Sequence, residues 1–284
     1  MDIYEIFEDK NKLGFGSLRF PKNKDGNVDT ALVSDMFDRY LCGGGKYFEA
    51  AYNYYQAEAT IKKCLVDRYP RSDYLLADKM PVNEVRTNGE YSRIFSEQIK
   101  KCGVDYFDFY LLHSVSYKTY LQTEKLGGFE FIKDLKERKL ARWIGFSFHD
   151  SAEVLGEILE KYHEIFDFVQ LQINYLDWES PVIQSRKCYD VAQKYNLPIF
   201  VMEPNKGGRL INLPNEAISI IQTVDADLSA ASCALRWVAS KKQIACVLSG
   251  MNSVEQVESN LASLQTPIVL SEKSNPTNSD YFEF

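Results

Sequence analysis

The sequence predicts an α/β fold, a (β/α)8 TIM barrel whose eight strands run parallel. Short apolar segments recur along the chain, a helical stretch follows each of them, and there are eight such units. Parallel strands need a long crossover connection, usually a helix, so this alternation favours a parallel sheet. Alternation alone also fits a doubly wound open sheet, and the count of eight favours the closed barrel.

The expected strands are short runs rich in aromatic and β-branched residues, as strands buried on both faces are. In chain order they are residues 13–20, 47–54, 74–80, 107–113, 142–148, 167–174, 198–204 and 244–250. Helical patterns fall between them, at about residues 29–42, 56–68, 88–102, 125–139, 151–162, 181–195, 226–240 and 253–264.

Several helix ends carry suitable capping residues. Asp29 and Ser151 stand where a side-chain oxygen caps an N-terminus, and Gly43 and Gly103 follow helices where a left-handed C-cap is favoured. No linker or low-complexity block divides the chain. We therefore expect one barrel domain over residues 1–266 and a polar, turn-rich tail over residues 267–284.

The composition is that of a globular protein with a sizeable core, with 45% hydrophobic and 26% charged residues in a chain of 284. A net charge of −7 and a pI near 5.2 argue against binding to a nucleic-acid backbone. No apolar run approaches the roughly 20 residues that span a bilayer, and the N-terminus does not look like a secretion signal. The sequence predicts a cytoplasmic protein with no membrane or nucleic-acid partner, and it does not indicate an oligomeric state.

The six cysteines are scattered, at positions 42, 64, 102, 188, 233 and 246. None forms a Cys-x-x-Cys pair, so the sequence offers no local pattern for a zinc or iron–sulfur site. We expect reduced thiols, most of them buried as small hydrophobes, and no metal.

Tyr54, Lys79 and His113 end three successive expected strands, and this is the most informative pattern in the chain. In a βα barrel such residues emerge together on the C-terminal face, where active sites lie. A phenol beside an ammonium becomes a better proton donor, because the positive charge favours the phenolate. Glu49 could hold the lysine and His113 could orient a carbonyl oxygen. Each residue alone is more often structural, and their joint placement raises the odds; His149 could face the same pocket.

The chain resembles the aldo-keto reductases over about residues 12–264. The segments that carry the resemblance are 13–16 (LGFG), 48–54 (FEAAYNY), 105–113 (DYFDFYLLH), 143–147 (WIGFS), 169–175 (VQLQINY), 202–204 (MEP) with Gly207 and Gly208, 248–250 (LSG), and 255–260 (EQVESN). They look closest to a bacterial subgroup that often carries a C-terminal ferredoxin-like domain. We expect that domain to be absent here, since no cysteine cluster follows residue 246.

The resemblance implies reduction of an aldehyde or ketone by NAD(P)H, with Tyr54 as proton donor. The family's Asp-Tyr-Lys-His set maps onto Glu49, Tyr54, Lys79 and His113, and its first member is Glu here instead of Asp. That extra methylene can shift the carboxylate by about an ångström and puts turnover in question.

For the cofactor, the resemblance assigns the nicotinamide carboxamide to Ser147 and Gln170, with Met202 where the family commonly stacks a tyrosine. The residue after Ser147, usually Asn, is Phe148 here, and the family's usual lysine for a 2′-phosphate is replaced by Gly250. NADP(H) is therefore expected over NAD(H) on family prevalence alone. The remaining positions that match cofactor contacts are Asn205, Lys206, Gly207, Gly208, Ser249, Gly250, Met251, Gln256 and Asn260.

Two other functions fit parts of the pattern. A barrel that binds the nucleotide with little turnover, as a sensor or interaction subunit, fits the departures at Glu49, Phe148 and Met202. A lysine-dependent aldolase-type barrel would use Lys79 for a Schiff base, although the Tyr-Lys-His grouping argues against it. The sequence does not identify the small carbonyl substrate, because specificity depends on the loops above the barrel.

Overall fold

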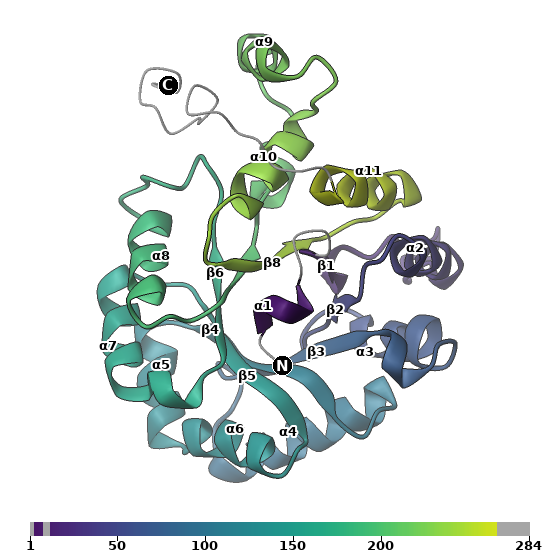
Figure 1. Cartoon of the computed structure of the whole chain (residues 1–284). Coiled ribbons are helices and arrows are strands. Elements are labelled where there is room, and N and C mark those ends of the chain that lie inside the picture. Colours follow the sequence, from purple (N-terminus) through teal and green to yellow (C-terminus); the bar gives the residue numbers. More distant parts are fainter. Residues whose placement is uncertain (1–2, 8–11, 266–284) are drawn as a thin grey trace.

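The computed structural model describes residues 3–7 and 12–265, and it confirms the closed barrel of eight parallel strands (Figure 1). Each strand pairs with its neighbours in sequence, and the last pairs with the first. The strands are β1 (Leu13–Gly16), β2 (Tyr47–Glu49), β3 (Leu75–Pro81), β4 (Phe107–Val115), β5 (Ala141–Phe148), β6 (Phe168–Gln172), β7 (Ile199–Met202) and β8 (Ile244–Ser249).

Most of the helices surround the strands as an outer ring, whereas the first helix lies across one end of the barrel (Figure 1). Their bounds are α1 (Ile3–Ile6), α2 (Thr30–Cys42), α3 (Ala57–Ile61), α4 (Asn88–Cys102), α5 (Tyr117–Lys125), α6 (Gly128–Glu137), α7 (Ala152–Tyr162), α8 (Ser185–Lys194), α9 (Asn215–Val224), α10 (Ala230–Ala239) and α11 (Val254–Gln265). Over the residues that the structure describes, no helix is both long and apolar enough to cross a membrane. The expected tail, residues 267–284, lies outside the described residues.

The expected elements are largely confirmed, with two kinds of correction. Strands 13–20 and 47–54 are shorter than expected, and the second ends at Glu49, so Tyr54 is not on a strand. The chain turns instead, because the Tyr54 amide donates to the Ala51 carbonyl at 3.0 Å. Helices α1, α5 and α9 were not expected; few of their apolar side chains are buried, so their sequences carry a weak helical pattern. The caps at Asp29 and Ser151 are confirmed, each accepting a backbone N–H of its helix. The left-handed C-cap is confirmed at Gly103, with a φ of 70°, but not at Gly43, whose φ is −78°.

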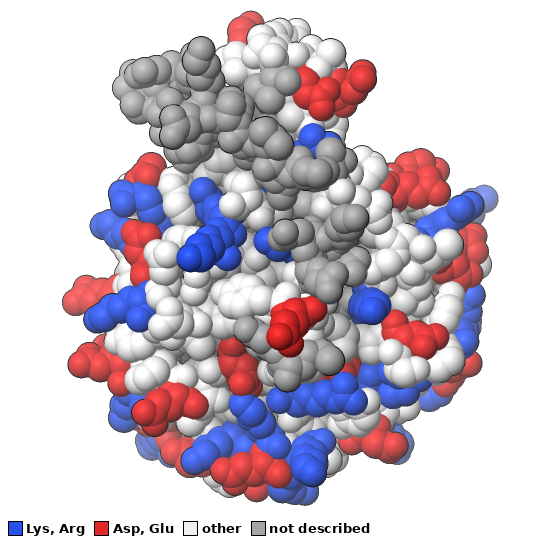
Figure 2. Space-filling view, viewed as in Figure 1, with Lys and Arg blue, Asp and Glu red and all other residues white. Residues whose placement is uncertain are grey.

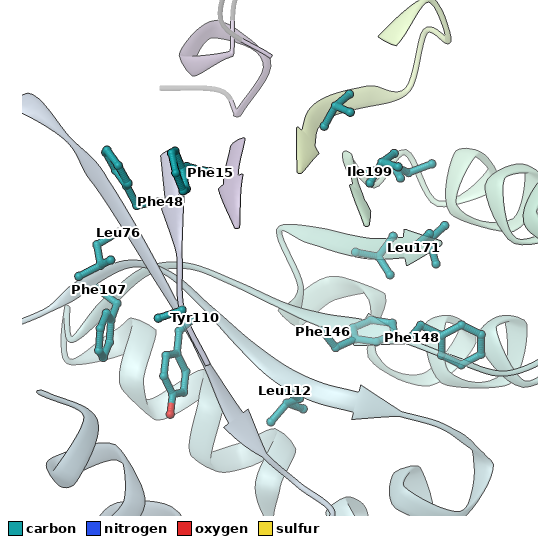
Figure 3. Packing of buried hydrophobic residues seen from close by; sticks show 14 of the residues in the cluster. Phe15, Phe48, Leu76, Phe107, Tyr110, Leu112, Phe146, Phe148, Leu171 and Ile199 are labelled. Atoms are coloured by element: carbon teal, nitrogen blue, oxygen red, sulfur yellow. The ribbon is translucent and has the colours of Figure 1, made fainter. Parts of the chain in front are cut away.

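The core has two layers, one inside the barrel and one between the strands and the helices. Inside, Tyr47, Phe109, Phe168 and Phe200 fill the lower half, and Phe7 beside α1 packs on Phe200 with ring centroids 5.2 Å apart. In Figure 1, α1 lies across this end of the barrel. The outer layer is larger, and Figure 3 shows part of it, including Phe15, Phe48, Phe107, Phe146 and Leu171.

Charged side chains of both signs mingle over the face seen in Figure 2. One carboxylate, Asp108 on β4, is instead fully buried. It accepts the Leu76 amide at 2.8 Å and contacts the guanidinium groups of Arg71 at 2.6 Å and Arg142 at 3.0 Å. These contacts tie β4 to β3 and β5 below the aromatic core.

Asp108→Ala is expected to lower the free energy of unfolding by about 3–5 kcal/mol, because it leaves a buried amide and two cations without their partner. Chemical denaturation of the purified variant measures this loss. Asp134→Ala, which removes a partner of Arg138 from an exposed pair, is the control and should cost about 0–1 kcal/mol. Equal losses in the two variants would contradict a structural role for Asp108.

Candidate active site

A polar layer lies directly above the aromatic layer inside the barrel. Alternate residues of a strand face the same side, so Glu49 follows Tyr47 on β2, Lys79 follows Ala77 on β3, and Gln170 follows Phe168 on β6. The residues Glu49, Lys79 and Gln170 of this layer are each at most 4% exposed. Burying such groups is costly unless they are paired, so their mutual contacts decide how the layer works.

Lys79 is the centre of this polar layer. Its ammonium forms an ion pair with Glu49 Oε1 and donates to the Tyr54 hydroxyl at 3.1 Å. Burial disfavours the charged lysine, but Glu49 and Tyr54 outweigh it and raise the pKa of Lys79 above its usual range. A lysine held in its charged form is a poor amine nucleophile, which argues against Schiff-base chemistry at this position.

Tyr54 reaches Lys79 from the loop between β2 and α3. Its ring lies edge-on to the His113 imidazole, with the centroids 5.7 Å apart. The side chain is half-buried and lines the cavity inside the barrel, and its hydroxyl accepts from Lys79. The phenol, ammonium and imidazole expected from the sequence are therefore brought together.

His113 lies near the end of β4, beside an irregularity in the pairing with β5. The register with β5 shifts between Leu112 and Val115, and Ser114 takes a left-handed φ of 59°. The Ser114 amide then donates to the Ser147 hydroxyl oxygen at 2.8 Å. His113 itself keeps the regular register with β3 and follows Phe109 and Leu111 on the inner face of β4, so strand alternation places it at the cavity inside the barrel.

The His113 imidazole is buried and lies in the positive field of Lys79. Burial, the lysine charge and the nearby His149 lower the pKa of His113 to about 2. A neutral imidazole at physiological pH keeps one N–H donor and one acceptor nitrogen. The ring can therefore donate a hydrogen bond to an oxygen without carrying charge.

A cavity of about 680 Å³ opens above the polar layer. Glu49, Tyr54, Lys79 and His113 all line it, and so does His149, as the sequence suggested. Its length extends from these residues to the loops after β7 and β8. This volume falls within the range of ligand sites for small molecules and cofactors.

Most of the residues assigned to the cofactor from the sequence line this cavity. They are Gln170, Met202, Asn205, Gly207, Gly208, Ser249, Gly250, Gln256 and Asn260. Three assigned residues do not. The Ser147 hydroxyl oxygen accepts a hydrogen bond from the Ser114 amide, and Lys206 forms an ion pair with Asp177. Met251 is fully buried in the outer core.

Arg19, which the sequence reasoning missed, also lines the cavity. It lies at the end of a 3₁₀ turn after β1, where the pattern had suggested continued strand. A Cβ on Gly250 would come within 2.9 Å of Arg19 Cδ, and one on Gly207 within 3.2 Å of Nη2. The arginine thus extends from the β8 loop to the β7 loop. The sequence feature that could have indicated Arg19 is a basic residue shortly after a glycine-rich first strand.

Two buried acceptor oxygens at this cavity have no hydrogen-bond partner within the described part of the chain. They are Gln170 Oε1 and Asn205 Oδ1. An unpaired buried acceptor is costly, so each is suited to an N–H or O–H of a bound molecule. Both match residues that the resemblance assigned to a dinucleotide, so the site fits such a cofactor.

The model of the family described as "Aldo/keto reductase family" matches residues 12–277. No curated protein matches the chain.

Solved structures share the fold at low sequence identity. The holo form of the aldo-keto reductase AKR11C1 from Bacillus halodurans superposes with a TM-score of 0.76 at 20% identity, over 93% of this chain and 90% of that one. An aldo-keto reductase from Klebsiella pneumoniae in complex with NADPH gives 0.72 at 20% identity, over 92% and 87%. A Klebsiella pneumoniae structure with NADP and acetate gives 0.74 at 19% identity, over 93% and 88%.

Proposed function

This chain belongs to the aldo/keto reductase family, and on that premise we propose that it reduces a small aldehyde or ketone to an alcohol with NADPH, using Tyr54 as the proton donor. The observation that carries the proposal is the set of contacts from Glu49 through Lys79 to the Tyr54 hydroxyl, at the edge of a cavity that can hold a dinucleotide.

The proposed chemistry assigns each side chain of the set one task. When bound, the reduced dinucleotide supplies the hydride that becomes the new C–H bond. Tyr54 gives its hydroxyl proton to the carbonyl oxygen, while the Lys79 ammonium stabilises the negative charge left on the phenol oxygen. Glu49 holds the ammonium in place. Neutral His113 donates its N–H to the carbonyl oxygen and so fixes the direction of the C=O bond.

Glu49 supports turnover here, although the family's usual Asp is shorter. Its longer side chain reaches Lys79 directly, so the methylene does not separate the pair. Phe148 is buried in the outer core and does not line the main cavity, so its substitution for Asn leaves the proton-donating set intact. Both observations favour an enzyme over a barrel that only binds the nucleotide.

The cofactor assignment rests on fit and on similarity. Unpaired acceptors at Gln170 and Asn205 suit the N–H groups of a nicotinamide dinucleotide, and Met202 offers an apolar surface for the ring. The similar Klebsiella pneumoniae structures that hold NADPH or NADP support NADP(H) as the form used.

We test the proposed function by mixing the purified chain with NADPH or NADH and a panel of aldehydes and ketones. Steady loss of the absorbance of the reduced cofactor, dependent on the carbonyl compound, is the expected result. Binding of the cofactor without consumption of any carbonyl compound would favour the nucleotide-binding alternative.

We assign the diphosphate of the dinucleotide to Arg19. The guanidinium reaches Gly207 from above Gly250, and the described residues give it no hydrogen bond or ion pair. Besides Lys79, it is the one cation among the described residues that line the cavity. The loops after β7 and β8, together with a guanidinium that has no partner among the described residues, form a suitable binding site for an anion.

Arg19→Met is expected to weaken the binding of NADPH and of NADH equally, by about tenfold to a hundredfold. This is the scale of a lost charge-assisted hydrogen bond. Fluorescence titration measures both affinities, with the exposed Arg138→Met as the control. A loss confined to NADPH would move the contact to the 2′-phosphate and contradict the diphosphate assignment.

A further inference from the structure

The second carboxylate oxygen of Glu49 makes contacts that the ion pair with Lys79 does not need. Oε2 accepts the Gln170 side-chain amide at 2.7 Å and the Tyr47 hydroxyl at 3.0 Å. Gln170 is on β6 and Glu49 on β2, so this contact crosses the interior of the barrel. Each of these three residues is at most 4% exposed, so little solvent is available to replace the contact.

The chemistry of Glu49 fixes which way the Gln170 amide points. A carboxylate paired with an ammonium is ionised and can only accept hydrogen bonds. Gln170 must therefore turn its NH2 group toward Glu49, and its oxygen is left facing away. That oxygen, Oε1, is the buried atom with no partner described above, in a residue that lines the cavity.

We propose that Glu49 is a positioning residue for the cofactor, which locks Gln170 as a pure acceptor and so makes the site select a nicotinamide over a nicotinic acid dinucleotide. This inference rests on the proposed function and deepens it. A carboxamide brings an N–H donor to Gln170 Oε1. A carboxylate brings only lone pairs and a negative charge, so two acceptors would face each other.

We call the fixing of the Gln170 amide by Glu49 the lock. It predicts a specific result for Glu49→Gln, which keeps the length of the side chain. Lys79 donates, so the new amide must turn its oxygen toward Lys79 and its NH2 toward Gln170. Gln170 then has to accept from that NH2 and present its own NH2 to the cavity. The same single change thus turns an acceptor into a donor at the cofactor while Gln170 itself is unaltered.

The test compares the dissociation constants of NADP⁺ and nicotinic acid adenine dinucleotide phosphate by calorimetry. The unaltered chain should prefer NADP⁺ by at least about a hundredfold, as sites built for an N–H group do. Glu49→Gln should abolish or reverse this preference. An unaltered chain that binds both ligands equally, or a Glu49→Gln variant with an unchanged ratio, would overturn the inference.

Three further variants separate the lock from a change of charge or of folding. Glu49→Asp keeps the charge but is shorter by one bond, about 1.5 Å, so Gln170 is released and the preference should fall. Gln170→Leu removes the amide and should bring the ratio near one while Glu49 and Lys79 stay paired. Tyr47→Phe removes the other contact to Oε2 and should leave the ratio unchanged. A preference that survives Glu49→Asp and Gln170→Leu would contradict the lock.

The same titrations separate this inference from the proposed function. If the unaltered chain binds neither dinucleotide, the proposed function fails and the inference fails with it. If it binds both equally, the proposed function stands and only the lock is overturned. Thermal melting curves show whether each variant is folded, and a folded variant is required for its ratio to count.

Discussion

Tyr54→Phe is expected to lower carbonyl reduction by at least about a hundredfold, the scale of lost general-acid catalysis. The ring stays in place against His113, but the hydroxyl that Lys79 contacts is removed. Because the change touches only the proton donor, the affinity for NADPH should barely alter. Steady-state rates with saturating cofactor, together with a fluorescence titration, measure the two quantities separately.

The matched control for this change is Tyr55→Phe. Tyr55 is the next residue in the same loop, is 58% exposed and does not line the main cavity, so its loss of a hydroxyl should leave the rate unchanged. Near-normal reduction by Tyr54→Phe would show that Tyr54 is a packing residue. An equal fall in both variants would indicate damage to the loop instead of loss of a proton donor.

Lys79→Met is expected to lower reduction by about a thousandfold or more. The ammonium that would stabilise charge on the Tyr54 oxygen is removed, and charge stabilisation of this kind is commonly the largest single contribution to catalysis. The variant also leaves the Glu49 carboxylate buried without its counter-ion, so stability should fall by about 3–5 kcal/mol. The rate is therefore to be measured well below the melting temperature of the variant.

Lys101→Met separates the two effects of Lys79→Met. Lys101 pairs with another buried carboxylate, Glu58, at 3.1 Å, but this pair links α4 to α3 outside the catalytic set. Its loss should lower stability without changing the rate of the folded enzyme. A Lys79→Met variant that is folded and retains its rate would contradict the proposed coupling between Lys79 and Tyr54.

The sequence by itself was sufficient to predict the barrel and to bring most of the candidate catalytic residues to one site. Eight apolar segments separated by helical stretches leave few ways to bury every strand, and the closed barrel does so. Tyr54, Lys79 and His113 could be grouped because successive parallel strands deliver their C-terminal ends to one face. The expectation for Tyr54 succeeded although β2 ends at Glu49, since the loop that follows stays beside β3.

Contacts between distant segments could be read only from the tertiary structure. Arg19 and Gly250 are more than 200 positions apart, and no local pattern indicates that an arginine side chain would lie over that glycine. Ser147 and Lys206 matched cofactor positions in the sequence, yet neither lines the cavity; the Ser147 hydroxyl oxygen accepts the Ser114 amide, and Lys206 pairs with Asp177. A sequence gives the donors and acceptors, but folding decides which of them meet.

Glu49 illustrates the same division most clearly. In the sequence it is a carboxylate one methylene too long, and the length raised a question about turnover. In the barrel the added length lets one oxygen reach Lys79 while the other reaches Gln170 across the interior. Residue type and strand position were determined by the sequence. The partner of the second oxygen depends on the diameter of the closed barrel, which only the packing of all eight strands sets.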